Sequence, residues 1–265
     1  MASWVRFRKD GGIFIGLLSG GGAHIAVHSG SFFEGAEPTG EQIETSTVEL
    51  LTPCVPGKFI ALWNNYRALA EKTKQEKPGE PLFFLKASSS FLAHQGIIRR
   101  PVGYDGKVVY EGELGIVIGK RCVNATEEQA WSAIFGYTCV NDVTALEELF
   151  RDPRFPQWTR AKSHDTFGVF GPSIATDIDP ATLTVRTLVD GRERQNYLCS
   201  DMFFAPHQIV QSISHSMTLE PGDVIACGTS IGVGPLRSGA EVQISIDGVG
   251  TLMNRFEHET ERASK

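Results

Sequence analysis

Short apolar runs separated by glycine and proline recur along the whole chain, and they limit what it can fold into. Examples are residues 11–18 (GGIFIGLL), 82–87 (LFFLKA) and 108–120 (VVYEGELGIVIGK). Runs of this length, rich in β-branched and aromatic residues, predict strands, and the glycines and prolines between them predict turns. We therefore expect an α+β fold that is predominantly β.

Four helices are expected among these strands, over residues 61–76, 127–135, 144–150 and 206–217. Thr126 precedes an acidic pair and suits a helix N-terminus. Thr144 and Glu147 have the spacing of a capping box, which would start the third of these helices.

The length and composition indicate an ordinary globular protein. The chain has 265 residues, enough for a main domain over residues 59–258 and a small β-rich N-terminal portion over residues 1–58. The net charge of -6 argues against a nucleic-acid surface, which needs a basic field. No apolar run approaches the roughly 20 residues of a membrane span, and we expect a cytoplasmic protein without a membrane partner.

The strand over residues 109–119 (VYEGELGIVIG) begins with two carboxylates on alternate residues. Glu111 and Glu113 share one face of that strand, where two like charges are costly unless a cation or donor compensates them. Asp142 ends a second apolar strand (FGYTCVND), and the Thr144 capping box leaves its carboxylate free. Three carboxylates at strand ends suit Mg²⁺ or Mn²⁺, although polar strand ends without a metal are common.

Two further segments carry candidate functional groups. Lys162 lies among aromatic residues in QWTRAKSHDTFGVFGP, where it either extends its ammonium group to water or faces the metal and stabilises an enolate. Residues 227–235 (CGTSIGVGP) form a glycine-rich turn that offers N–H groups to an anion, or simply a tight turn. The turn lacks the spacing of nucleotide-binding loops.

Together these segments resemble the fumarylacetoacetate hydrolase family from about residue 59 to residue 256. The resemblance rests on YEGELGIVIGKR, GYTCVNDVTA, WTRAKSHDTFGVFGP and GTSIGVGPL, in that order. It implies a mixed β-roll of the family's C-terminal domain type, a homodimer, and Mg²⁺ or Mn²⁺ bound by three carboxylates. The implied residues are Glu111, Glu113 and Asp142 for the metal, Lys162 beside a 2-oxo acid, and Thr229 and Tyr66 for substrate binding.

The sequence departs from the family where hydrolytic members activate water. They carry a His–Glu pair in a pattern like NYxxHxxE, whereas residues 65–72 read NYRALAEK. Leu69 and Lys72 take the two positions in strict register, and a slip of one residue gives Ala68 and Glu71. Either another histidine serves, with His94 the nearest candidate downstream, or the reaction needs no activated water.

A second departure concerns the substrate. Family members often read NDVSARD where this chain has NDVTALE, so Leu146 replaces an arginine that can contact an anion. This substitution puts the usual substrate in doubt and leaves the metal site unaffected.

These observations predict a divalent-metal-dependent enzyme that acts on a small 2-oxo or 2,4-dioxo carboxylic acid. The leading hypothesis is C–C cleavage, by hydrolysis or decarboxylation, through an enolate that Lys162 stabilises, with Glu71 as a proton shuttle. The alternatives are an isomerase or tautomerase of a 2-hydroxydienoic diacid in aromatic catabolism, and a binding protein that has lost its chemistry.

Overall fold

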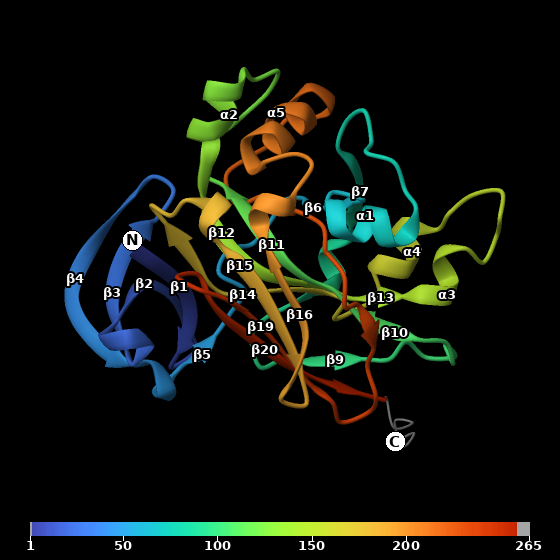
Figure 1. Ribbon diagram of the computed structural model, residues 1–265. Coiled ribbons are helices and arrows are strands. Elements are labelled where there is room, and N and C mark those ends of the chain that lie inside the picture. Colours follow the sequence, from blue (N-terminus) through green and yellow to red (C-terminus); the bar gives the residue numbers. More distant parts are fainter. Residues whose placement is uncertain (1, 259–265) are drawn as a thin grey trace.

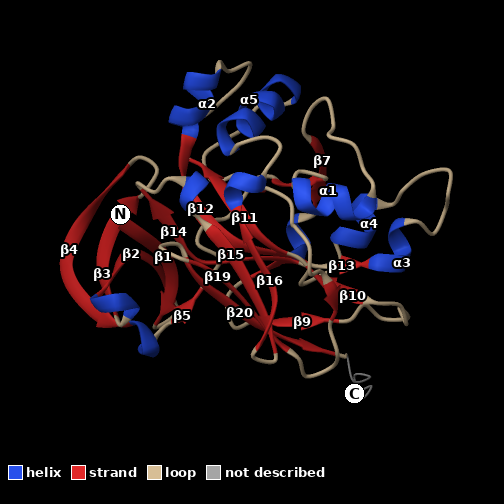
Figure 2. Cartoon of the chain, in the orientation of Figure 1, coloured by secondary structure: helices blue, strands red, loops and turns tan. Residues whose placement is uncertain are grey.

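The computed structural model describes residues 2–258, and strands dominate it (Figure 1). Figure 2 shows short helices at the margins of the strand-rich body. The predicted α+β, predominantly β fold is confirmed. Among residues 2–258, no helix is long and apolar enough to cross a membrane.

The largest sheet has 12 strands, and it mixes antiparallel and parallel pairs. Its main path runs β4 (Gly35–Glu44), β3 (His24–Ser31), β2 (Gly12–Ser19), β1 (Ala2–Lys9), β14 (Gly168–Thr176), β12 (Ile134–Asp142), β11 (Gly112–Ile118), β17 (Val224–Ala226), β6 (Phe59–Trp63) and β7 (Leu82–Lys86). Off this path, β5 (Glu49–Leu50) pairs with β1, and β8 (Phe91–Leu92) pairs with β14.

Two smaller sheets complete the β structure. The five-stranded sheet runs β16 (Arg192–Leu198), β15 (Thr184–Val189), β19 (Glu241–Ile246), β20 (Gly250–Glu257) and β9 (Ile97–Arg99). The three-stranded sheet runs β13 (Thr144–Ala145), β10 (Val108–Tyr110) and β18 (Gly234–Pro235).

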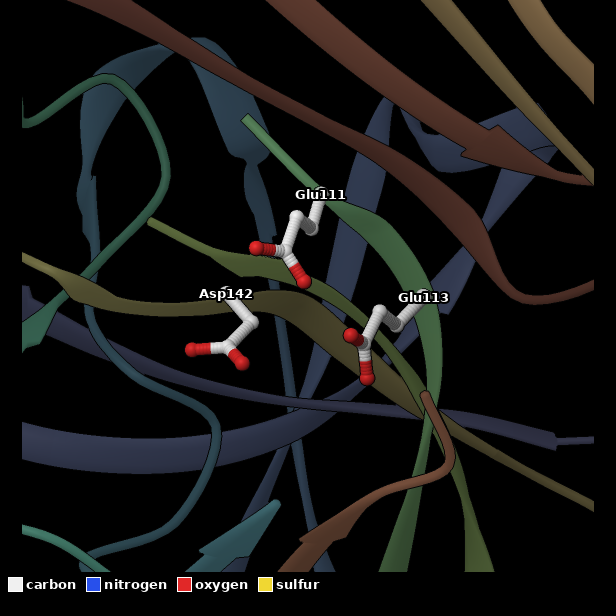
Figure 3. Close-up of side chains that lie close together, drawn as sticks. All are labelled: Glu111, Glu113 and Asp142. Carbon is white, nitrogen blue, oxygen red and sulfur yellow. The ribbon is translucent and has the colours of Figure 1, made fainter. Parts of the chain in front are cut away.

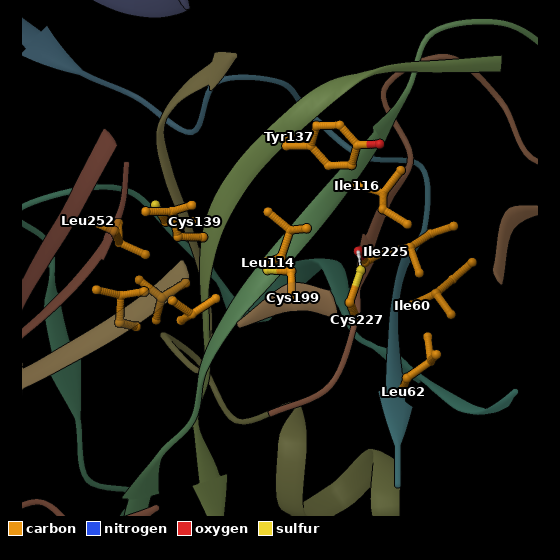
Figure 4. Packing of buried hydrophobic residues seen from close by; sticks show 14 of the residues in the cluster. Ile60, Leu62, Leu114, Ile116, Tyr137, Cys139, Cys199, Ile225, Cys227 and Leu252 are labelled. Atoms are coloured by element: carbon orange, nitrogen blue, oxygen red, sulfur yellow. Dashed lines mark hydrogen bonds between the residues drawn. The ribbon is translucent and has the colours of Figure 1, made fainter. Parts of the chain in front are cut away.

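Strand β11 lies at the centre of the molecule, and every one of its residues is buried. Leu114 and Ile116 pack with Ile225 and Tyr137 in the main apolar cluster (Figure 4). A Cβ at Gly115 would lie 2.6 Å from the Val140 side chain, so the close approach of β12 requires glycine there. Burial on both faces explains why this strand reads as a continuous apolar run rather than an alternating one.

The N-terminal strands β1 to β4 form an antiparallel meander that continues the large sheet. The connection is the pairing of β1 with β14, in which Trp4 lies opposite Ile174. The division into residues 1–58 and 59–258 as separate units stays a prediction.

Two of the expected helices form close to their predicted positions. Helix α2 (Glu127–Ala133) begins after Thr126, whose hydroxyl caps the amide of Gln129. Helix α5 (Pro206–Ser216) packs against α2. Figure 1 shows this pair together at the top of the molecule.

The other two helix predictions are partly wrong because sheet pairing takes their first residues. The segment predicted as a helix over 61–76 starts within β6, which pairs with β17 and β7, so α1 spans only Arg67–Thr73. The segment predicted over 144–150 starts with β13, which pairs with β10, and α3 spans Leu146–Leu149. A short helix that was not predicted, α4 (Trp158–Lys162), packs against α3, β7 and β13.

The capping box predicted at Thr144 is also wrong. The Thr144 hydroxyl donates a hydrogen bond to Glu111 Oε1 at 2.6 Å, away from the helix. Glu147 Oε2 instead accepts from the Tyr104 hydroxyl and from the Lys107 amide at 2.7 Å.

Candidate metal centre

Three carboxylates come together where β11 begins and β12 ends (Figure 3). Glu111 precedes β11, Glu113 lies within it, and Asp142 is the last residue of β12. The two strands are antiparallel, and the Asp142 amide donates to the Glu111 carbonyl at 2.9 Å, which fixes the acids beside each other. One oxygen from each carboxylate lies within 4.8 Å of the others.

Burial makes this cluster electrostatically demanding. Glu113 and Asp142 are fully buried, whereas the Glu111 side chain is 17% exposed and forms the open side of the cluster. Burial, together with the nearby charges of Asp142 and Glu111, raises the pKa of Glu113 well above its usual value. Glu113 Oε2 accepts from the Gly228 amide at 2.7 Å, and its buried Oε1 has no partner among the described residues.

Lys162 points into the cluster, so the alternative that it extends its ammonium group to water is wrong. Its Nζ donates to Glu111 Oε1 at 2.8 Å and to Asp142 Oδ2 at 2.6 Å. Burial alone would lower the pKa of Lys162, but the charges of Asp142, Glu111 and Glu113 outweigh it and raise the pKa. The ammonium also lies 5.4 Å from the centre of the Phe84 ring.

A second lysine, Lys86 at the end of β7, contacts the cluster and was missed in the sequence. Its fully buried ammonium donates to Asp142 Oδ1 and to the Val143 carbonyl. Burial lowers the pKa of Lys86. Burial alone would raise the pKa of Asp142, but Lys162 and Lys86 together hold it below its usual value.

The residues of the cluster fit a divalent cation. Three carboxylates against the two lysines leave one uncompensated negative charge when all five groups are ionised. The unpartnered Glu113 Oε1 supplies a free oxygen ligand in a buried position. An all-oxygen set with one open side is typical of Mg²⁺ or Mn²⁺ sites that leave room for a substrate.

The glycine-rich turn contacts this centre from the other side of β11. Gly228, which holds Glu113, has a φ of +88°, a left-handed conformation that favours glycine. The buried Thr229 hydroxyl donates to the Gly112 carbonyl at 2.9 Å and accepts from Gln195 Nε2 at 2.9 Å. The turn therefore positions Glu113, and contact between Thr229 and a substrate stays a prediction.

The Asn-Tyr pair before α1 is anchored to the same turn. Asn65 Nδ2 donates to the Cys227 carbonyl at 2.9 Å, and the fully buried Tyr66 packs edge-on against Tyr197. Leu69 packs against the apolar core from α1. Glu71 is exposed and has no hydrogen bond to the carboxylate cluster, so its assignment as a proton shuttle gains no structural support.

Two histidines, His94 and His164, are relevant to the general base that is missing at position 69. His94 Nδ1 accepts the Met253 amide at 3.1 Å, and burial lowers the pKa of its ring. His164, two residues after Lys162, contacts Glu148 through Nε2 and Oε2 at 2.8 Å. The sequence analysis missed this pair, because packing of α3 against α4 joins residues that no spacing rule connects.

The sequence matches two family models. The model described as fumarylacetoacetate (FAA) hydrolase C-terminal matches residues 58–257, and one described as Rv2993c-like, N-terminal matches residues 3–53. Oxaloacetate tautomerase YisK of Bacillus subtilis is 34% identical over 254 residues, which cover 89% of this chain and 83% of that protein.

Solved structures resemble the whole fold. A 2-hydroxyhepta-2,4-diene-1,7-dioate isomerase from Mycobacterium marinum matches with a TM-score of 0.90 and 36% identity, over 98% of this chain and 100% of that one. A maleylpyruvate hydrolase from Sphingobium sp. SYK-6, in complex with manganese (II) ion and pyruvate, matches with a TM-score of 0.78 and 27% identity. That match covers 97% of this chain and 100% of the hydrolase.

Proposed function

Because this chain belongs to the fumarylacetoacetate hydrolase family, we propose that it is a divalent-metal-dependent enzyme that forms the enolate of a small 2-oxo acid. Glu111, Glu113 and Asp142 would hold Mg²⁺ or Mn²⁺. The cation supplies Lewis-acid polarisation of the 2-oxo group. Manganese and pyruvate in the related maleylpyruvate hydrolase support this choice of metal and substrate class.

The observation that carries the proposal is the position of Lys162. Its ammonium bonds to two of the three carboxylates, so a substrate oxygen that approaches the open side of the cluster meets a fixed positive charge. Enolate formation moves negative charge onto that oxygen. Lys162 therefore stabilises the transition state more than the bound ketone. Lys86 holds the far side of Asp142 and keeps that carboxylate ionised.

Keto–enol tautomerisation, or the related isomerisation of a dienol acid, is the reaction that best fits the remaining residues. Both move protons and use no water, which agrees with Leu69 at the position of the family's water-activating histidine. Likeness to an oxaloacetate tautomerase and to a dienedioate isomerase supports this reaction class.

C–C cleavage is the second candidate, favoured by the likeness to the maleylpyruvate hydrolase. Decarboxylation of a 2-oxo diacid, or hydrolysis of a 2,4-dioxo acid, passes through the same kind of enolate, so Lys162 serves either outcome. Substrate contacts from Thr229 and Tyr66, a homodimer and a cytoplasmic location stay predictions from the family resemblance.

Oxaloacetate with Mg²⁺ or Mn²⁺, followed at the enol absorbance, tests the proposal. We expect metal-dependent interconversion of the keto and enol forms that EDTA abolishes and Glu113→Gln strongly reduces. Pyruvate as product would identify decarboxylation instead. Absence of any turnover with oxaloacetate, with an acylpyruvate and with a 2-hydroxydienoic diacid would refute the enzyme proposal and favour a binding protein.

A further inference from the structure

We propose that His164, oriented by Glu148, is the group that moves protons in this site, in place of the His–Glu pair that the family carries after Asn-Tyr. This inference rests on the proposed function. The pair joins helix α3, which carries Glu148, to the turn after helix α4, which carries His164.

The geometry of the pair is that of an imidazole held by a carboxylate. Nε2 of His164 lies 2.8 Å from Oε2 of Glu148, and their side chains are 26% and 13% exposed. The ring packs edge-on against the buried Phe167 at 5.3 Å between centres, which limits its rotation. Nδ1 makes no hydrogen bond to any residue of the range 2–258.

Both members of the pair lie on segments that already reach the carboxylate cluster. His164 follows Lys162 by two residues, and Lys162 donates to Glu111 and Asp142. Glu148 follows Thr144 by four residues, and Thr144 donates to Glu111. Figure 1 shows α3 and α4 side by side, next to β13.

The turn that carries His164 is also fixed to the second lysine. Ser163 Oγ accepts the Ala87 amide at 2.9 Å, and Ala87 directly follows Lys86. The residues on either side of Ser163 are thus a lysine that bonds to the cluster, Lys162, and His164 itself. The side chains of His164, Glu148 and Glu111 are all partly exposed, whereas Lys162 is almost fully buried.

The hydrogen bond between His164 and Glu148 determines which nitrogen of the imidazole ring carries the proton. An ionised Glu148 accepts the proton on Nε2, which leaves the lone pair on Nδ1. Nδ1 takes a proton from C3 of the 2-oxo acid, the C–H electron pair forms the C2–C3 double bond, and the carbonyl pair moves onto the C2 oxygen. The imidazolium then returns the proton to that oxygen or to another carbon, so no water, oxidant or reductant is consumed. Glu148 stabilises the imidazolium and acts as a positioning residue.

Neither His94 nor His207 offers this arrangement. The Nδ1 of His94 already accepts a backbone amide. His207 also pairs with a glutamate, Glu127, at 2.9 Å, but this pair joins α5 to α2, apart from α3 and α4 in Figure 1. His207 is therefore a matched control, a partly exposed His–Glu pair outside the site.

The test compares His164→Ala, Glu148→Gln and His207→Ala with wild type in the oxaloacetate tautomerisation assay. We expect His164→Ala to lower kcat by about 10²–10⁴-fold with little change in KM, and added imidazole to restore part of that loss. Glu148→Gln should lower kcat less, and His207→Ala should leave it unchanged, with or without imidazole. A blank without enzyme corrects for catalysis by imidazole in solution.

A second readout does not depend on activity. In the metal-free protein, at a pH high enough for the ring to be neutral, ¹⁵N NMR should place the proton of His164 on Nε2, and Glu148→Gln should weaken that preference. A proton on Nδ1 in the wild type would overturn the proposal. So would an active His164→Ala variant, or a loss of kcat that imidazole does not restore. An active wild type with any one of these three results refutes this inference alone. A wild type that is inactive on all the proposed substrates refutes the proposed function as well.

Discussion

Replacing Glu113 by glutamine should weaken metal binding without lowering the stability of the metal-free protein. One oxygen of each carboxylate lies within 4.8 Å of the others, and two charges at that separation would repel by about 3.5 kcal/mol at an effective dielectric constant of about 20. Burial, together with this repulsion, is what raises the pKa of Glu113. Glutamine removes that repulsion and can still accept the Gly228 amide. We therefore expect Glu113→Gln to be at least as stable as wild type in EDTA.

With Mg²⁺ bound, the wild type should instead be more stable than Glu113→Gln. At a Mg²⁺ concentration of about 100 times its Kd, the wild type gains about 2.7 kcal/mol, which raises Tm by about 5–10 °C. Losing one of three carboxylate ligands should weaken affinity by about 100-fold or more, which reduces the gain to about 0.4 kcal/mol and the shift to about 1 °C.

Thermal denaturation with EDTA and with added Mg²⁺ measures both effects. Asp223→Asn is the matched control, because Asp223 is a fully buried carboxylate that pairs with Lys58 outside the cluster. It should lower Tm and keep the full metal-induced shift. An equal Mg²⁺ shift in Glu113→Gln and wild type would refute the assignment of the metal ligands.

Three further substitutions test the roles of Lys162, of the α1 positions 69 and 72, and of His94. Lys162→Met should lower kcat by about 10²–10³-fold with little change in KM, as steady-state kinetics will show; an effect confined to KM would make Lys162 a ground-state binder. Leu69→His with Lys72→Glu places a His–Glu pair three residues apart on α1 and should add acylpyruvate hydrolysis, seen by product analysis, while tautomerisation stays unchanged. Because burial lowers the pKa of His94 in the folded state, the unfolded chain binds this proton first as the pH falls, and stability is lost below about pH 6.5. His94→Gln should therefore lose less Tm than wild type between about pH 7.5 and pH 5.5, and an unchanged loss would contradict this origin.

The strand pattern predicted the acidic part of the site because it depends on local rules. Alternation along one strand puts Glu111 and Glu113 on one face, and the end of a second apolar run supplies Asp142. Lys86 was missed because a lysine that ends an apolar strand reads as a solvated end, whereas the fold buries it against Asp142 and Val143, which are distant in sequence.

Other features depended on contacts between distant segments, which a single sequence does not contain. Thr144 reads as a helix cap, but pairing of β13 with β10 draws it into a strand and directs its hydroxyl to Glu111. The contact between His164 and Glu148 arises from the packing of α3 against α4. The family pattern predicts the base at position 69, in a different segment from the one that brings His164 and Glu148 together.

A crystal structure grown with Mn²⁺ and oxalate would show whether the carboxylate cluster holds the metal and the substrate, because oxalate mimics the enolate and Mn²⁺ scatters anomalously. We expect one anomalous peak in contact with the carboxylates of Glu111, Glu113 and Asp142, with oxalate on the same ion and within hydrogen-bond distance of Lys162. An empty cluster at saturating Mn²⁺, or an ion held by other residues, would contradict this assignment.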